Sequence, residues 1–224
     1  EYLVGHFWDK FDFTDTAYID LPEVTEQAFA EYITLLHHVP QQVSKSSTES
    51  MLSKARQNLK MFDYITGLYE KYLYDPNSPL RNEELYIPVL EHILVVDDRA
   101  QEYTLRVKAQ LDMARKNRPG TKSSDIIVTL ADGTKKSLYG VKAKYAILFF
   151  NNPDCPACAE TIRFIDSSPL LTTMIDDGLI EVFAVYPDTD LDAWRKHRED
   201  IPQSWINGYD AEQRLRKNES YDLK

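Results

Sequence analysis

The sequence predicts an α/β protein in which an all-helical N-terminal domain, residues 1–118, precedes a second domain, residues 119–224, built on a βαβ unit. Before residue 118, apolar residues recur at the three- and four-residue spacing of amphipathic helices. After it, short apolar runs alternate with helical patterns. Of the seven glycines, only Gly5 and Gly67 precede residue 119. This distribution indicates long helices first, then shorter elements with turns.

Five helical patterns fill the first domain, each with one apolar face. Pro22 suits a first helical turn. Thr48 and Asn82 are predicted N-caps, because their side-chain oxygens can accept hydrogen bonds from the first free backbone N–H groups. Aromatic residues at helical spacing are expected to pack in the core. The predicted helices are Leu21–His38, Thr48–Leu59, Met61–Leu73, a segment from Asn82 through Ile93, and Gln101–Arg115.

A polar stretch, Arg118–Ser124, separates the two predicted domains, since its Pro-Gly pair ends a helix and the remaining residues are polar. Beyond it, the segments Asp125–Leu130 and Thr134–Leu138 flank Ala131–Gly133. An Asp-Gly pair between two such segments is typical of a tight turn. The sequence therefore predicts a β-hairpin at the start of the second domain.

Strand and helix patterns then alternate. Tyr145–Phe150 is nearly all apolar, as expected of a strand buried on both faces. A predicted helix over Cys155–Ile165 precedes a second buried strand, Ile180–Tyr186, and a further helix over Leu191–Arg198. Strand, helix, strand and helix in this order imply parallel pairing with a right-handed crossover.

The chemistry of the chain is predicted to reside in Cys155-Pro156-Ala157-Cys158. Cys155 and Cys158 are the only two cysteines, and they lie at a strand-to-helix transition. The exposed backbone N–H groups and the dipole of the following helix favour a thiolate at Cys155. A thiolate is the species that attacks disulfides. Position and spacing therefore predict thiol–disulfide exchange.

The cysteine pair has two other interpretations. A structural zinc site needs a fuller set of ligands, and none of the five histidines forms a pair at metal-ligand spacing near the motif. We therefore expect no metal and no cofactor. The second interpretation is a purely structural disulfide. A bridge across so short a loop constrains little of the chain and therefore contributes little stability.

Charge and hydropathy exclude several classes of partner. The formal net charge of −10 argues against nucleic acid or an anionic membrane surface as the main partner. No apolar stretch approaches the roughly 18 residues of a membrane-spanning helix. Two cysteines in one motif fit a cytosolic redox protein as well as an exported one.

The segment from Lys144 to His197 carries a family resemblance. Its stretches LFFNNPDCPACAETI, IEVFAVYPDTD and LDAWRKH resemble the thioredoxin-like superfamily, and within it the exported bacterial thiol–disulfide oxidoreductases. The helical region contains HFWDKFDF, EKYLYDPNSPLRNEELYIPVLE and ARKNRPGTKSSDI. It resembles an uncharacterised helical domain that often precedes thioredoxin-like domains.

The resemblance implies a role for each residue of the motif. Cys155 would be the exposed attacking thiol, and Cys158 the buried thiol that resolves the mixed disulfide. Pro156 shapes the helix start and removes one N–H donor. Many relatives carry Trp where this chain has Asp154, whose carboxylate should raise the pKa of the Cys155 thiol and oppose the helix dipole. Peroxiredoxins carry Thr at the position of Asn152, so peroxidase activity is the weaker option.

Together these observations predict a thiol–disulfide oxidoreductase that acts on protein disulfides and exchanges electrons with a second thiol partner. The resemblance implies a periplasmic or otherwise exported location, with a membrane anchor before processing as one option. The alternative is a non-catalytic helical interaction module on a thioredoxin-like scaffold. It treats the two cysteines as incidental.

The C-terminal end of the sequence carries one more expectation. By the same resemblance, a strand entered through a cis-proline should follow the second strand–helix unit. Gln213–Lys224 has the character of the segment that leads up to this proline. The chain is therefore expected to be truncated before that strand, with an uncovered apolar edge on the sheet.

Overall fold

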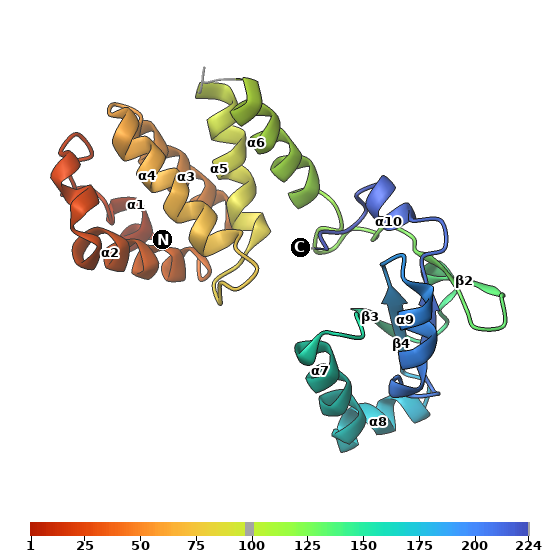
Figure 1. Ribbon diagram of the computed structural model, residues 1–224. Coiled ribbons are helices and arrows are strands. Elements are labelled where there is room, and N and C mark those ends of the chain that lie inside the picture. The colour runs from red at the N-terminus through yellow and green to blue at the C-terminus, as the bar shows by residue number, and fades with distance from the viewer. Residues whose placement is uncertain (97–100, 224) are drawn as a thin grey trace. The chain divides into compact units, whose positions relative to one another are not determined.

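Two units divide the chain, Glu1–Thr121 and Lys122–Leu223. The computed structural model describes residues 1–96 and 101–223. Helices build the first unit, and a five-stranded sheet with helices builds the second (Figure 1). This is the α/β architecture that the sequence predicts, with the helical part first.

The helices of the first unit begin at residues that satisfy their free N–H groups. The Asn58 side chain accepts hydrogen bonds from the N–H groups of Lys60 and Met61, at 3.0 and 3.3 Å. Asn82 accepts from the N–H of Leu85 at 3.3 Å, which confirms it as an N-cap. The elements are α1 (Tyr2–His6), the 3-10 turn η1 (Thr16–Asp20), α2 (Pro22–Leu36), α3 (Gln41–Ala55), α4 (Leu59–Leu73), α5 (Glu83–Val96) and α6 (Gln101–Ala114).

One predicted helix start is wrong. The helix expected to begin at Thr48 begins at Gln41, directly after Pro40, and Thr48 lies buried inside it. The first turns of α3 are mostly polar, so apolar periodicity could not reveal them. The Thr48 hydroxyl is tolerated in the core because it accepts a hydrogen bond from the Tyr69 hydroxyl at 3.5 Å.

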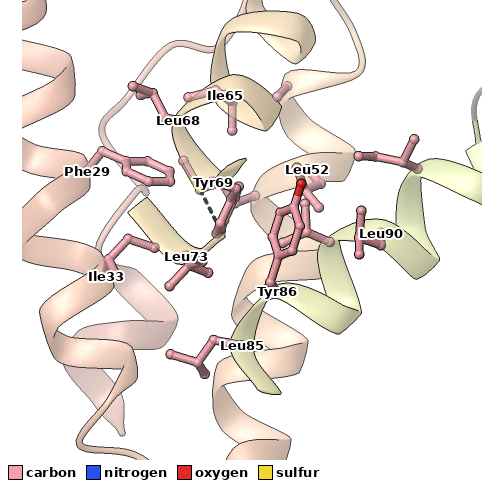
Figure 2. Packing of buried hydrophobic residues seen from close by; sticks show 14 of the residues in the cluster. Phe29, Ile33, Leu52, Ile65, Leu68, Tyr69, Leu73, Leu85, Tyr86 and Leu90 are labelled. Atoms are coloured by element: carbon pink, nitrogen blue, oxygen red, sulfur yellow. Dashed lines mark hydrogen bonds between the residues drawn. The ribbon is translucent and has the colours of Figure 1, made fainter. Parts of the chain in front are cut away.

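Aromatic rings fill the core of the helical unit, as the sequence predicts. Phe29, Tyr32 and Tyr69 are completely buried, and the rings of Phe29 and Tyr69 meet edge to face at 4.8 Å. The Tyr69 hydroxyl also donates to the sulfur of Met51 at 3.3 Å (Figure 2). Buried tyrosines need such partners, because a hydroxyl without one loses its hydrogen bonds to water.

The second unit is a mixed sheet with strand order β2-β1-β5-β4-β3. Strands β3, β4 and β5 are parallel, whereas β1 is antiparallel to both β2 and β5. The hairpin and the parallel β3–α7–β4 unit confirm the sequence prediction. The elements are β1 (Ile127–Thr129), β2 (Lys135–Ser137), η2 (Leu138–Gly140), β3 (Tyr145–Phe150), α7 (Pro156–Ser167), α8 (Pro169–Asp176), β4 (Ile180–Tyr186), α9 (Leu191–His197), η3 (Arg198–Asp200), β5 (Ile206–Tyr209) and α10 (Arg214–Lys217).

The sequence does not predict strand β5, because the strand is short and contains Asn207 and Gly208. The glycine is required by packing. A Cβ atom at Gly208 would lie 2.6 Å from the Cγ2 atom of Val128 and 2.9 Å from the carbonyl oxygen of Thr129. Only a residue without a side chain lets β5 approach β1 this closely.

Strand β3 differs from its prediction as a strand buried on both faces. It lies at the end of the sheet and pairs only with β4, so Tyr145 and Ala146 are exposed and the rest of the strand is half-buried. Its apolar composition is shared by buried strands, and composition cannot reveal how many neighbours a strand has. Within the described residues no peptide bond is cis.

An ion pair ties the chain after α6 to the start of α5. The Arg118 Nε and Nη2 atoms donate to the two carboxylate oxygens of Glu84 at 2.7 and 2.6 Å. Gln41 adds a third donor at 3.2 Å. The hydrogen bond from Arg118 is the main reason why the pKa of Glu84 lies below its ordinary value, against an opposing effect of burial.

We predict that Glu84→Gln lowers the unfolding free energy by no more than about 1 kcal/mol at pH 7, because the pair is partly solvent-exposed. The folded-state pKa of Glu84 is depressed. The stabilisation is therefore present above the unfolded-state pKa and is lost as the pH falls through the folded-state value. Urea unfolding of the full chain, followed by circular dichroism at neutral and at acid pH, measures both effects.

Glu23→Gln is the matched control, since Glu23 also lies in the first turn of a helix. Within the described residues it forms no ion pair. Equal losses of stability in the two variants would contradict a specific contribution from Arg118.

Candidate active site

The two cysteines follow the carboxyl end of β3. The carboxyl ends of the parallel strands lie at the same edge of the sheet. Such edges are where open α/β sheets bind ligands. The connecting loop is held by its own hydrogen bonds, since Cys155 N–H donates to the carbonyl oxygen of Asn152 at 3.1 Å. The Asn152 side chain donates to Asp188, after β4, at 2.7 Å.

Cys155 is the N-cap of α7. Its backbone is extended, with φ −101° and ψ 104°, and its Sγ accepts a hydrogen bond from the N–H of Cys158 at 3.1 Å. Pro156 occupies the first helical position, where its missing N–H costs nothing. A sulfur in this place receives both a backbone N–H and the positive end of the helix dipole, which favour a negative charge on it.

A disulfide joins Cys155 and Cys158, with their Cα atoms 5.2 Å apart. Both cysteines are half-buried, so the expectation that Cys158 is buried and Cys155 exposed is wrong as a statement about accessibility. Pro156 and Ala157, between the two cysteines in the first turn of α7, are exposed, and neither cysteine is fully buried. The two sulfurs differ instead in hydrogen bonding, because only Cys155 caps the helix.

Asp154 and Pro156 flank Cys155 and are both exposed. The N–H of Asp154 donates to the side-chain oxygen of Asn152 at 3.2 Å, which fixes the backbone just before the cysteine. Its carboxylate faces solvent. Water and salt therefore weaken its effect on a neighbouring charge.

A small cavity of about 50 Å³ adjoins the disulfide and is lined by both cysteines. Its apolar walls come from α7, α9 and the segment after η3 through Ile162, Trp194 and Ile201. Its polar wall includes Asn151, Asn207, His197, Arg198 and Asp200. The cavity is therefore amphipathic and lies directly beside the sulfur atoms.

Asn151 and His197 are two cavity residues that sequence analysis did not select. Asn151 is 8% exposed, and its Nδ2 has no hydrogen-bond partner in the part of the chain that the structure describes. His197 Nδ1 lies 3.0 Å from the carbonyl oxygen of Ala193. Since a carbonyl only accepts, Nδ1 carries the proton of the neutral ring and Nε2 keeps a free lone pair. Asn151 ends the apolar run and could have been noticed, but nothing in the sequence connects His197 with the cysteines.

Comparison with solved structures gives a match over nearly the whole chain. A crystal structure described as a thioredoxin-like protein from Bacteroides caccae ATCC 43185 superposes with a TM-score of 0.94. It is 44% identical over 99% of this chain and 80% of its own. The chain belongs to the thioredoxin-like proteins. The thioredoxin-like fold also accounts for the position of the Cys-x-x-Cys pair between a strand and a helix.

Residues 1–117 match the family described as Domain of unknown function (DUF5106). The match covers more than half of the chain, which therefore belongs to this family as well. Comparison with curated proteins found no match.

Two further solved structures come from Bacteroides fragilis. The C-terminal domain of an uncharacterized protein from strain NCTC 9343 is 42% identical, over 48% of this chain and 77% of its own, with a TM-score of 0.47. A conserved protein of unknown function is 29% identical, over 48% of this chain and 79% of its own, also with a TM-score of 0.47.

We predict that Asp154→Asn accelerates alkylation of reduced Cys155 by iodoacetamide about two- to fivefold at neutral pH, because a negative charge next to the thiolate is removed. Mass spectrometry after limited labelling separates Cys155 from Cys158. Asp166→Asn, an exposed change farther along α7, serves as the control and should leave the rate unchanged. An unchanged or slower rate in Asp154→Asn would show that the carboxylate does not act on the sulfur.

Proposed function

We propose that this thioredoxin-like protein is a thiol–disulfide oxidoreductase that reduces or exchanges disulfides in other proteins. The observation that carries the proposal is the capping of α7 by Cys155, whose Sγ receives the N–H of Cys158 at 3.1 Å. The same two residues can close a disulfide. The environment of the Cys155 sulfur thus favours a thiolate, and the Cys158 sulfur is close enough to form a disulfide with it.

The first step begins from the reduced pair. The Cys155 thiolate attacks one sulfur of a substrate disulfide, forms a mixed disulfide and releases the other substrate sulfur as a thiolate, which takes up a proton. The backbone N–H of Cys158 favours the attacking charge before the reaction. Cys155 is half-buried, so part of the residue is accessible to a substrate.

In the second step Cys158 loses its proton and attacks the Cys155 Sγ. The Cys155–Cys158 disulfide forms, the mixed disulfide breaks, and the second substrate sulfur leaves with a proton. Two electrons have then moved from this pair to the substrate. A second thiol protein must return two electrons and two protons to the disulfide for another cycle.

The cavity beside the sulfurs supplies groups for the second step. His197 Nε2 has a free lone pair and is the proton acceptor that we assign to the Cys158 thiol. The unpartnered Nδ2 of Asn151 can donate to a sulfur that carries negative charge. Arg198 and Asp200 line the same cavity and bring one charge of each sign.

We place the reaction outside the cytoplasm, in the periplasm or an equivalent exported compartment. The support is the resemblance of the CPAC segment to exported oxidoreductases, together with the preference of persistent disulfides for oxidising compartments. Among residues 1–96 and 101–223, no helix is both long and apolar enough to span a membrane.

We predict that Cys158→Ser traps a covalent complex with a disulfide-containing test protein such as insulin, because the attack that releases the mixed disulfide is lost. The measurement is a reducible band in non-reducing electrophoresis. Cys155→Ser should form no such band. Equal bands with the two variants, or none with either, would favour a spectator disulfide on an interaction module.

We predict that His197→Gln slows the second step about tenfold or more, a modest loss for removal of a general base. Rapid mixing with a chromogenic disulfide separates the two steps. Alkylation of Cys155 should keep its wild-type rate in this variant, which distinguishes a role in proton transfer from a loss of structure.

His38→Gln is the control for this experiment, since His38 is exposed in the helical unit. If His197→Gln slows both steps equally, or neither, the assignment of His197 is wrong.

A further inference from the structure

The helical unit contains a larger cavity of about 210 Å³, which is unrelated to the cysteines. It lies between α4 and α6, with α5 as its floor. Each helix lines it with one stripe of residues at three- and four-residue spacing, the pattern of a single helix face. The cavity is therefore bounded entirely by elements of one unit.

Two features keep the cavity open. On α4, Gly67 leaves room, because a Cβ atom built there would meet nothing within 4 Å. Next to it, Glu70 bridges to α6. It accepts hydrogen bonds from Arg106 Nη1 at 3.0 Å and from Gln110 Nε2 at 2.9 Å. The hydrogen bonds of Glu70 hold α6 against α4. Because Gly67 has no side chain, the adjoining part of the cavity stays unfilled.

Tyr86 brings an unused hydrogen-bonding group to this space. The residue is 2% exposed and lines the cavity, and its hydroxyl has no hydrogen-bond partner within the described residues. Figure 2 shows its ring on α5, with the hydroxyl at the end away from the helix. Burial, and then the negative charge of Glu70, raise the pKa of Tyr86 far above its ordinary value. The hydroxyl therefore stays neutral and can donate as well as accept.

The remaining walls restrict the chemistry of an occupant. Leu90, Ile93 and Val107 provide aliphatic surface. Glu70 and Arg106 neutralise each other. An apolar cavity of roughly 150 Å³ is large enough for benzene, so this one has room for a ring with a substituent.

We propose that this cavity binds a small neutral aromatic ring carrying one hydroxyl or carbonyl group, which hydrogen-bonds to the Tyr86 hydroxyl. This assigns a ligand site to the helical unit and does not depend on the function of the cysteines. The ring can belong to a free small molecule or to a tyrosine side chain of another polypeptide.

The test uses the full chain and two probes of almost equal size, p-cresol and toluene, with binding measured by ligand-observed NMR titration. The wild-type protein should bind p-cresol about five- to tenfold more tightly than toluene, the ratio expected from one additional hydrogen bond. In Tyr86→Phe this ratio should fall to about one while toluene binding is retained. An unchanged ratio would overturn the role of the hydroxyl.

Gly67→Leu should fill the cavity and abolish binding of both probes. Gly5→Leu is the control, because Gly5 lies on α1 of the same unit and its Cβ would also meet nothing within 4 Å. If Gly67→Leu does not fold, the ratio measured in Tyr86→Phe still decides the question. Undetectable binding of p-cresol to the wild type, or equal binding to Gly67→Leu, would overturn the site.

A third probe, N-acetyltyrosine amide, distinguishes the two sources of the ring. Binding of both phenols would point to a tyrosine side chain, and binding of p-cresol alone to a free small molecule. Preferential binding of benzoate or glucose would overturn the proposed ligand class.

Discussion

The candidate active site depends on the parallel pairing of β3 with β4. Six residue pairs, from Tyr145 with Ile180 to Phe150 with Val185, align the two strands. The N–H of Asn151 continues this ladder to the carbonyl oxygen of Val185 at 3.0 Å. The chain therefore leaves β3 at a fixed point. Because the loop between β3 and α7 is short, it restricts the position of Cys155. Cys155 reaches the helix N-terminus because the strand register places it there.

At the N-terminus of α7, the backbone N–H of Cys158 acts on the Cys155 sulfur in both its disulfide and its thiolate form. It caps the helix by donating to Cys155 in the disulfide form, and after reduction it faces a thiolate that it favours more strongly. Asp154 acts against this preference from an exposed position. In the proposed mechanism, the balance between the two sets the reactivity of the sulfur, and the amphipathic cavity lined by both cysteines supplies the group that accepts the proton. The helical unit has its own aromatic core and its own cavity.

Continuous apolar runs and turn residues predicted much of the second unit. β3 and β4 were predicted residue for residue, because β3 is an unbroken apolar run and β4 is interrupted only by Glu181, and Asp132-Gly133 marked the hairpin. The start of α3 was missed because its first turns are polar. β5 was missed because Asn207 and Gly208 hide its pattern. The edge position of β3, the cavity group His197 and the space beside Gly67 arise from tertiary packing, which periodicity along one segment cannot describe.

The equilibrium reduction potential of the Cys155–Cys158 pair tests the central claim most directly. The full chain is equilibrated in glutathione buffers of increasing reducing strength, and the fraction of disulfide is determined by alkylation and mass spectrometry. A redox-active pair should titrate reversibly as a two-electron couple between about −270 and −120 mV, the range of known oxidoreductases. A potential below about −300 mV, or cysteines that stay oxidised throughout the series, would indicate a structural disulfide and contradict the account.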